Sequence, residues 1–310
     1  MTDSLLRQDL ANRDLTTELF DLESRRGRAE VHAKEPGVAA GLAEAAWLYG
    51  RYDVAVTLHK NDGDDVNPGD PLLSIEGDGG HVLALERLSL NLLQRMSGIA
   101  TMVRRMQAEV RAISSSVCVV ATRKTPWGLL DKRAVHLGGG GTHRLGLGDA
   151  ILLKNNHLAL LGSREEDSAR VAIERAWESR QLCAFIEIEV RTSEGALAAA
   201  RTFRRLRVSR GELYPCLLML DNWPPETIAR LTLALREERL WDHVLLEASG
   251  RISELNLRDY AEAGVDAISM GALTHSCRAL DVSQKLILEE GTKNVDRTGI
   301  VRNAVRSSAN

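Results

Sequence analysis

Apolar residues recur along the chain with two different spacings. Between residues 85 and 112 they stand three or four apart, which predicts one long helix with Gly98 as a close-packing point or a kink. Residues 28–85, before this helix, are typical of short strands and turns. After it, apolar runs alternate with helical stretches. Strands are expected near 117–121, 149–153, 184–190, 216–221, 243–248 and 265–270, and helices near 165–180, 193–206, 224–239 and 253–263.

Strands that alternate with helices pair in parallel through right-handed crossovers, so the second part of the chain is a barrel or a doubly wound sheet. Residues suited to chemistry lie at or near the carboxyl ends of the expected strands. In a barrel these ends meet at one mouth, whereas an open sheet would place its site at a single switch point. The pattern therefore favours the barrel. The strand-end residues are Arg123, Lys124, Lys154, Glu189, Asp221, Glu247 and Gly271.

Composition limits the functional classes. The 310 residues can hold one large α/β domain and a smaller one, and a net charge of −3 argues against a general nucleic-acid binder. The four cysteines lack metal-like spacing, and Cys118, Cys183 and Cys216 are expected to be buried, inert thiols of a reducing cytoplasm. The N-terminus lacks a signal-peptide layout, and no apolar run approaches the ~20 residues that span a bilayer.

Positive charge is concentrated locally between residues 122 and 157. Arg123 and Lys124 follow one apolar run, His143 and Arg144 follow a run of four glycines, and Lys154 closes another apolar run. Two unit charges ~4 Å apart repel by roughly 4 kcal/mol at an effective dielectric near 20, so such a cluster is costly without an anion. The alternative is a set of surface salt bridges. We therefore expect a pocket for a small, strongly anionic ligand, with His143 as a further donor and His157 either functional or structural.

Carboxylates and small residues lie at other strand ends. Residues 186–190 alternate isoleucine and glutamate, so Glu187 and Glu189 point into the barrel if the isoleucines face the helices. Buried carboxylates need a cation or a metal. Asp221 could complete a magnesium site with Glu189, although both glutamates could instead only neutralise Lys124 and Lys154. Small residues allow a phosphate to approach the backbone after the last two strands, at Ser249, Gly250, Gly271 and Ala272.

Several ordered motifs resemble one known family. The chain is similar over nearly its whole length to the quinolinate phosphoribosyltransferases. The motifs that carry the resemblance are Asp14-Leu15-Thr16-Thr17, the run from Glu35 to Leu42, Glu86-Arg87-Leu88-Ser89-Leu90-Asn91, Ser97-Gly98-Ile99-Ala100-Thr101, Thr122-Arg123-Lys124-Thr125, His143-Arg144-Leu145-Gly146-Leu147, Leu220-Asp221-Asn222 and the run from Gly271 to Ser276.

The resemblance implies a fold and an activity. The fold would be an N-terminal open-faced α/β sandwich (residues 1–112, joined by C-terminal helices at 276–310) and a partial, seven-stranded α/β barrel (residues 113–275) of the type II phosphoribosyltransferase class. The activity would be phosphoribosyl transfer from phosphoribosyl pyrophosphate to quinolinate with decarboxylation. Nicotinate mononucleotide, pyrophosphate and carbon dioxide would be the products, in NAD biosynthesis. A homodimer or higher oligomer in the cytoplasm would carry out the reaction.

The resemblance also implies roles for individual residues. Arg123, His143, Arg144 and Lys154 would hold the two quinolinate carboxylates, and Arg87 would reach in from the partner subunit. Lys124 would contact phosphoribosyl pyrophosphate, and Glu189 and Asp221 would bind Mg²⁺. Lys124, Lys154, Glu189 and Asp221 would be the catalytic set. Glu247 would approach the ribose hydroxyls, and the 5-phosphate pocket would be lined by Ser249, Gly250, Gly271 and Ala272.

The chain departs from the family pattern at several positions. The loop from the Thr122 motif to His143 is about two residues shorter than usual. Leu130 and His136 stand where arginine is common, Asn155 replaces an aspartate, and Arg251 replaces a second glycine.

Three other functions are compatible with parts of the sequence. A related transferase could act on a different anionic ring. A barrel aldolase could form a Schiff base on Lys154, although this leaves Arg123, Lys124 and Arg144 unexplained. Residues 63–72 resemble the turn of a biotinyl or lipoyl carrier, but that module needs a modified lysine on an exposed hairpin.

Overall fold

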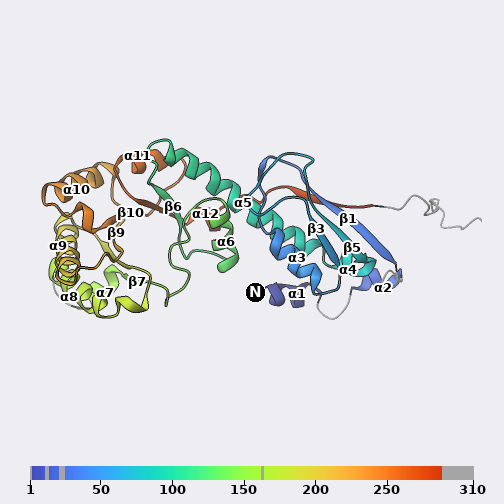
Figure 1. Cartoon of the computed structure of the whole chain (residues 1–310), viewed down its shortest axis with the longest axis horizontal. Coiled ribbons are helices and arrows are strands. Elements are labelled where there is room, and N and C mark those ends of the chain that lie inside the picture. Colours follow the sequence, from blue (N-terminus) through green and yellow to red (C-terminus); the bar gives the residue numbers. More distant parts are fainter. Residues whose placement is uncertain (1, 11–13, 21–24, 162–163, 288–310) are drawn as a thin grey trace, which may run out of the picture.

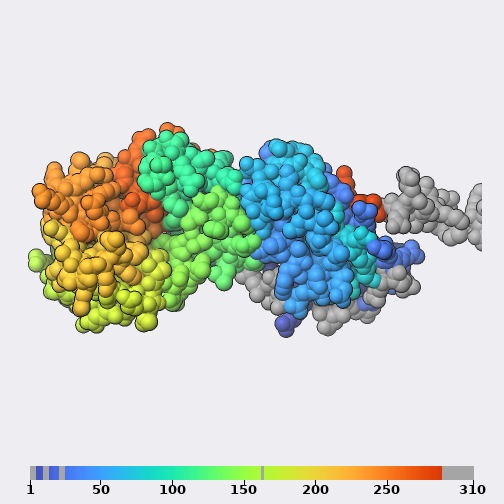
Figure 2. Space-filling model, viewed as in Figure 1, coloured from blue at the N-terminus to red at the C-terminus, as the bar shows by residue number. Residues whose placement is uncertain are grey.

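The computed structural model describes residues 2–10, 14–20, 25–161 and 164–287. They form two lobes, and helix α5 (Glu86–Arg111) runs from one to the other (Figure 1). In the space-filling view the N-terminal lobe is blue and the larger lobe runs from green to orange (Figure 2). No helix among these residues is long and apolar enough to cross a membrane.

The N-terminal lobe is built on a four-stranded antiparallel sheet of order β12-β1-β5-β3. Along β1, Ala29, Val31 and Ala33 are buried against the helices of the lobe, because alternate side chains of a strand face the same side. The strands of the sheet are β1 (Arg26–Ala33), β3 (Ala55–Leu58), β5 (Pro71–Asp78) and β12 (Val282–Leu286), and the other elements are α1 (Thr2–Leu10), α2 (Leu15–Leu19), the paired β2 (Gly37–Val38) and β4 (Asp65–Val66), α3 (Leu42–Gly50) and α4 (Gly79–Ala84).

Two expectations for this lobe were wrong. Residues 28–85 include the helices α3 and α4 as well as strands and turns. The expected C-terminal helices at 276–310 are replaced over residues 282–286 by β12, whose Gln284 lies opposite Val31. A strand forms there because β1 offers a free edge. The rest of that expectation, from residue 288 onward, lies outside the described residues.

The larger lobe contains a parallel sheet of order β6-β11-β10-β9-β8-β7. From β7 to β11 the strands follow the order of the chain, and β6 then pairs with β11. The sheet is therefore a ring that is open between β6 and β7, as expected for a barrel, whereas a doubly wound sheet would reverse its strand order in the middle. Of the seven strands expected, six form among the described residues, and Gly141 adds an isolated parallel bridge to Val120 beside β6. The strands are β6 (Cys118–Ala121), β7 (Ile151–Leu153), β8 (Ile186–Val190), β9 (Cys216–Asp221), β10 (Leu245–Ser249) and β11 (Ala267–Met270).

Helices cover the outside of the parallel sheet (Figure 1). Their apolar faces bury one core with the sheet residues Ile188, Leu218 and Leu246, and Phe203 is completely enclosed. The core leaves the carboxyl ends of the strands free to carry polar groups. The helices are α6 (Leu129–Leu137), α7 (Asn155–Ala159), α8 (Glu165–Glu178), α9 (Ser193–Arg210), α10 (Pro225–Glu237), α11 (Leu257–Glu262) and α12 (Ala272–His275).

Helix α5 belongs to both lobes. Its first half packs in the N-terminal core through Leu92 and Leu93, and its second half packs in the barrel core through Ile99 and Val103. The expected domain boundary at residue 112 therefore stays a prediction. Gly98 is a close-packing point: a Cβ there would lie 2.1 Å from the carbonyl oxygen of Arg278, which crosses the helix.

All four cysteines are free thiols. Cys216 is buried as expected, whereas Cys118 and Cys183 are partly exposed. Burial raises the pKa of Cys216 to about 12, so this thiol stays protonated and inert at neutral pH.

Candidate active site

A cavity of about 430 Å³ opens at the carboxyl ends of the barrel strands. Nine of the residues expected at a site line it: Arg123, Lys124, His143, Arg144, Lys154, Glu189, Asp221, Glu247 and Ser249. Four further lining residues were not expected to belong to a site: Thr122, Leu152, Met219 and Ser269. The strand-end rule thus located most of the cavity.

Strand alternation explains which side chains reach the cavity. In β8, β9 and β10 the cavity-facing positions are two apart, so each strand contributes its last inward residues. Met219 faces the cavity for this reason, but an apolar residue in an apolar strand gave no signal in the sequence. Ser269 was detectable in principle, because it is a polar residue inside the apolar strand β11.

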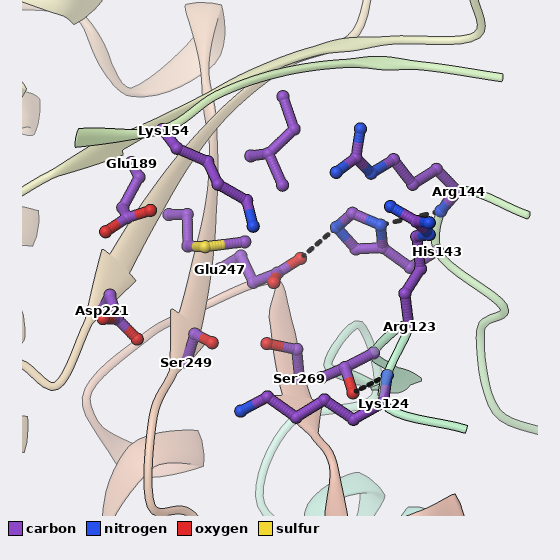
Figure 3. A pocket seen from close by; sticks show the side chains of 13 residues that line it. Arg123, Lys124, His143, Arg144, Lys154, Glu189, Asp221, Glu247, Ser249 and Ser269 are labelled. Carbon is purple, nitrogen blue, oxygen red and sulfur yellow. Dashed lines mark hydrogen bonds and ion pairs between the residues drawn. The ribbon is translucent and has the colours of Figure 1, made fainter. Parts of the chain in front are cut away.

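The cavity has a cationic side and an acidic side. Arg123, His143 and Arg144 lie together on one side, and Glu189 and Asp221 lie opposite, with Lys124 and Lys154 reaching into the space between them (Figure 3). This arrangement would receive an anion and a cation at neighbouring positions.

Burial and charge crowding shift pKa values on both sides of the cavity. Burial and the neighbouring Arg123 lower the pKa of Arg144, whose side chain is only 7% exposed. Burial and the neighbouring Asp221 raise the pKa of Glu189. Each side therefore favours a ligand of the opposite charge.

His143 is held by the protein at both ring nitrogens. Its Nε2 lies 2.9 Å from Glu187 Oε2 and 3.2 Å from Glu247 Oε2, and its Nδ1 lies 2.7 Å from the backbone nitrogen of Arg144. Glu187 thus pairs with His143, and not with Lys124 or Lys154 as one reading of the sequence allowed. A hydrogen bond from His143 to a ligand would have to replace one of these contacts.

The cluster of His143, Glu187 and Glu247 retains a proton. Burial alone would lower the pKa of His143, but the two carboxylates outweigh it and raise the pKa to about 9. Burial and Glu247 raise the pKa of Glu187 to about 7. A proton on Nε2 donates to the two carboxylates, and the contact from the Arg144 backbone is a hydrogen bond only while Nδ1 is unprotonated. A metal could use this spacing, since the ligand atoms lie within 4.8 Å of one another, but the internal ion pairs already occupy them.

His157 has a structural role. Its backbone N–H donates to the carbonyl oxygen of Lys154 at 2.8 Å, and its Nδ1 accepts a hydrogen bond from the Lys154 backbone at 2.9 Å. These contacts form the first turn of α7 and hold the backbone of Lys154 at the end of β7. Of the two interpretations of His157, functional or structural, these contacts support the structural one.

Of the expected phosphate-binding residues, Ser249 lines the cavity, and Gly250 and Gly271 are closely packed. Gly250 has φ 94°, and a Cβ there would lie 2.6 Å from Asn222 Oδ1; a Cβ on Gly271 would lie 3.2 Å from Lys124 Cδ. Arg251 also adopts a left-handed backbone, with φ 53°, at the position where the family pattern has glycine. Gly250, Gly271 and Ala272 do not themselves line the cavity. Their role in binding phosphate stays a prediction.

Arg87 is not part of this cavity within its own chain. It is an exposed residue in the first turn of α5, and it does not line the cavity. Its expected contribution to the site of a partner subunit stays a prediction.

Fold and site together define a class: an α/β barrel whose strand ends carry a cavity lined by clustered cations and carboxylates. Comparison with known proteins identifies the family. Residues 14–97 match the N-terminal domain of quinolinate phosphoribosyl transferase, and residues 99–285 match its C-terminal domain. The chain belongs to the quinolinate phosphoribosyl transferase family. A Schiff-base aldolase or a carrier module is no longer needed to explain Lys154 or the turn at residues 63–72.

Relatives match over most of their length. The chain is 36% identical to a probable nicotinate-nucleotide pyrophosphorylase (carboxylating) of Methanothermobacter thermautotrophicus, over 91% of this chain and 96% of that protein. It is 36% identical to the protein of the same name from Bacillus subtilis, over 91% and 90%. The crystal structure of NadC from Streptococcus pyogenes superposes with a TM-score of 0.78 at 31% identity, covering 92% of this chain and 95% of that one.

Proposed function

We propose that the protein transfers the phosphoribosyl group of phosphoribosyl pyrophosphate to quinolinate and decarboxylates the product. Nicotinate mononucleotide, pyrophosphate and carbon dioxide result, as a step of NAD biosynthesis. The observation that supports this most is the two-sided cavity, with arginines facing two carboxylates across one mouth. The names of the relatives agree with it.

The cationic side fits a ring dicarboxylate. Arg123 and Arg144 offer planar forks suited to carboxylates, and Lys154 adds a point contact. His143 closes this side of the pocket and orients the backbone of Arg144. In the proposed oligomer, Arg87 of a second subunit completes the ring site.

The remaining polar groups fit the phosphoribosyl donor. Lys124 reaches towards Ser249 across the floor of the cavity (Figure 3). In the proposal it contacts the pyrophosphate ester and Glu247 approaches the ribose hydroxyls. The 5-phosphate lies against the backbone of Ser249, Gly250, Gly271 and Ala272.

Glu189 and Asp221 fit a magnesium ion. They offer carboxylate oxygens, the donors that Mg²⁺ prefers, and burial together with the neighbouring Asp221 raises the pKa of Glu189. When bound, the ion would neutralise charge on the departing pyrophosphate.

The chain's contribution to the reaction is positioning and charge neutralisation. The pyridine nitrogen forms a bond to the ribose anomeric carbon as the bond to pyrophosphate breaks, and the electron pair leaves with pyrophosphate. The acidic side, with Glu189, Asp221 and Glu247, favours the positive charge that develops on the ribose. The ring nitrogen is then cationic, and its charge stabilises the electron pair that the breaking bond to the neighbouring carboxylate leaves on the adjacent ring carbon. Carbon dioxide leaves, and this ring carbon takes up a proton from solvent.

Two further parts of the proposal concern context. The protein acts as a homodimer or a higher oligomer, because Arg87 lies outside the cavity of its own chain. The cytoplasm is its compartment, in keeping with four free thiols.

Carbon dioxide release from quinolinate tests the function directly. We expect release that depends on both phosphoribosyl pyrophosphate and magnesium. A folded protein that releases no carbon dioxide would refute quinolinate as substrate and favour a related transfer to another anionic ring.

A further inference from the structure

Helix α6 carries two adjacent buried charges, Asp131 and Lys132. Their side chains are 0% and 2% exposed, and neither lines the cavity. Neighbouring residues of a helix point about 100° apart, so each of the two contacts a different segment. Buried charges are retained only where partners satisfy them, and an apolar pair is often as stable. The hydrogen-bond partners of Asp131 and Lys132 therefore show which segments of the chain these charges hold in place.

Lys132 joins the two segments that carry the pocket arginines. Its Nζ donates to the carbonyl oxygen of Ala121 at 2.9 Å and to that of Thr142. Ala121 is two residues before Arg123, and Thr142 is two residues before Arg144. One ammonium group therefore ties the backbones that set the distance between the two guanidinium groups.

Burial and the neighbouring arginines make the position of Lys132 costly for a charged group. Burial lowers its pKa to about 8, and Arg123 and Arg144 contribute to the shift. A third cation beside two arginines adds repulsion that a neutral side chain would avoid. The two carbonyl contacts offset this cost, together with the attraction of the Glu247 and Asp149 carboxylates.

Asp131 anchors the segment that carries Lys124. It accepts hydrogen bonds from Arg95 Nε and Nη2, both at 2.8 Å, from Trp127 N at 3.2 Å, and from Thr125 Oγ1. The guanidinium of Arg95 also lies over the Trp127 ring, 5.2 Å from its centroid.

The same network reaches Lys124 from its other side. Arg95 Nη2 donates to the carbonyl oxygen of Thr274 at 2.8 Å, and Thr274 Oγ1 donates to the carbonyl oxygen of Lys124 at 2.8 Å. Asp131 and its partners therefore fix the Lys124 backbone against both α5 and α12.

We propose that Asp131 and Lys132 are positioning residues with separate tasks: Lys132 sets the spacing of Arg123 and Arg144 for the ring dicarboxylate, and Asp131 holds Lys124 for the phosphoribosyl donor. The inference rests on the proposed function and goes beyond it, because neither residue touches the substrates.

The test compares Michaelis constants for the two substrates. Lys132→Met keeps the length of the side chain and removes its donors, and we expect the KM for quinolinate to rise about tenfold or more while the KM for phosphoribosyl pyrophosphate changes less than about threefold. Asp131→Asn should raise the KM for phosphoribosyl pyrophosphate about tenfold or more and change the KM for quinolinate less than about threefold. Lys132→Arg, which retains charge and donors, should restore part of the quinolinate affinity.

Arg133→Met is the matched control. Arg133 is the next residue of α6 and forms two ion pairs, with Glu44 and Asp62, but it faces the N-terminal lobe. The Arg133→Met variant should have both KM values within about twofold of the wild type, whatever its effect on thermal stability.

The outcomes separate the two proposals. A wild-type protein without quinolinate turnover overturns the proposed function and this inference with it. An active wild type beside a folded Lys132→Met variant with unchanged KM values overturns the inference alone. The inference is also overturned if Lys132→Met and Asp131→Asn each raise the two KM values equally, since a merely structural role would affect the binding of both substrates.

Discussion

Arg144→Ala should abolish ring binding and leave the fold intact. Arg144 is almost enclosed, and among the described residues its guanidinium donates a single, long hydrogen bond, 3.5 Å to the carbonyl oxygen of Ala150, so its removal costs the fold little. Removal also relieves the repulsion with Arg123 that lowers the pKa of Arg144. We therefore expect a melting temperature equal to or above that of the wild type.

The loss of binding follows from the contacts that Arg144 can offer. A hydrogen bond to a charged group contributes about 1.5–3 kcal/mol, and a fork contributes two such bonds that are not fully additive. A loss of about 3–4 kcal/mol corresponds to a drop in quinolinate affinity of roughly 10² to 10³-fold.

Equilibrium titration of quinolinate, together with thermal unfolding, measures both quantities on one preparation. Arg201→Ala is the control, since Arg201 is an exposed arginine of α9 that pairs with Glu238 outside the cavity. An Arg144→Ala variant with unchanged affinity would refute the assignment of the ring site. A variant that lost affinity only because it unfolded would refute the electrostatic argument.

Three other outcomes are expected. Gly98→Ala should lower the free energy of urea unfolding by about 1–3 kcal/mol, because its Cβ would meet the carbonyl oxygen of Arg278. Gly50→Ala is the control and should be neutral, since open space surrounds Gly50; equal effects of the two substitutions would contradict the packing argument. Binding of dianionic quinolinate should raise the pKa of Lys132 above about 8, so calorimetry in two buffers near pH 8 should detect more proton uptake by the wild type than by Lys132→Met, and the difference should vanish near pH 6, where Lys132 is already protonated; equal uptake by the two proteins at pH 8 would contradict this shift. Chelation of magnesium should stop turnover, and Asp221→Asn should need about tenfold more magnesium for half-maximal rate; an unchanged requirement would remove Asp221 from the metal site.

Sequence periodicity located the elements of the barrel and most of the cavity. Apolar runs of strand length mark buried parallel strands, and the residue after such a run must lie at the strand end. Arg123, Lys154, Glu189 and Asp221 could therefore be assigned to one mouth before any coordinates were known. Gly98 was recognised as special for a similar local reason, since glycine interrupts an otherwise regular helix.

Elements of weak or ambiguous periodicity were assigned wrongly. Helix α3 is short and rich in alanine, so its pattern did not stand out among the turns around it. Strand β12 forms by pairing with the edge of β1, which lies far away in the sequence, so no local sequence pattern predicts this strand.

By itself, the sequence of this protein determined which segments are strands and helices and which side chains lie at their ends, because these follow from local periodicity and steric rules. Tertiary structure alone decided the partners. It joined His143 to Glu187 and Glu247, and it placed the ammonium of Lys132 under two backbone segments. Such pairings depend on strand register and on the curvature that closes the barrel, which arise only when all the strands pack together.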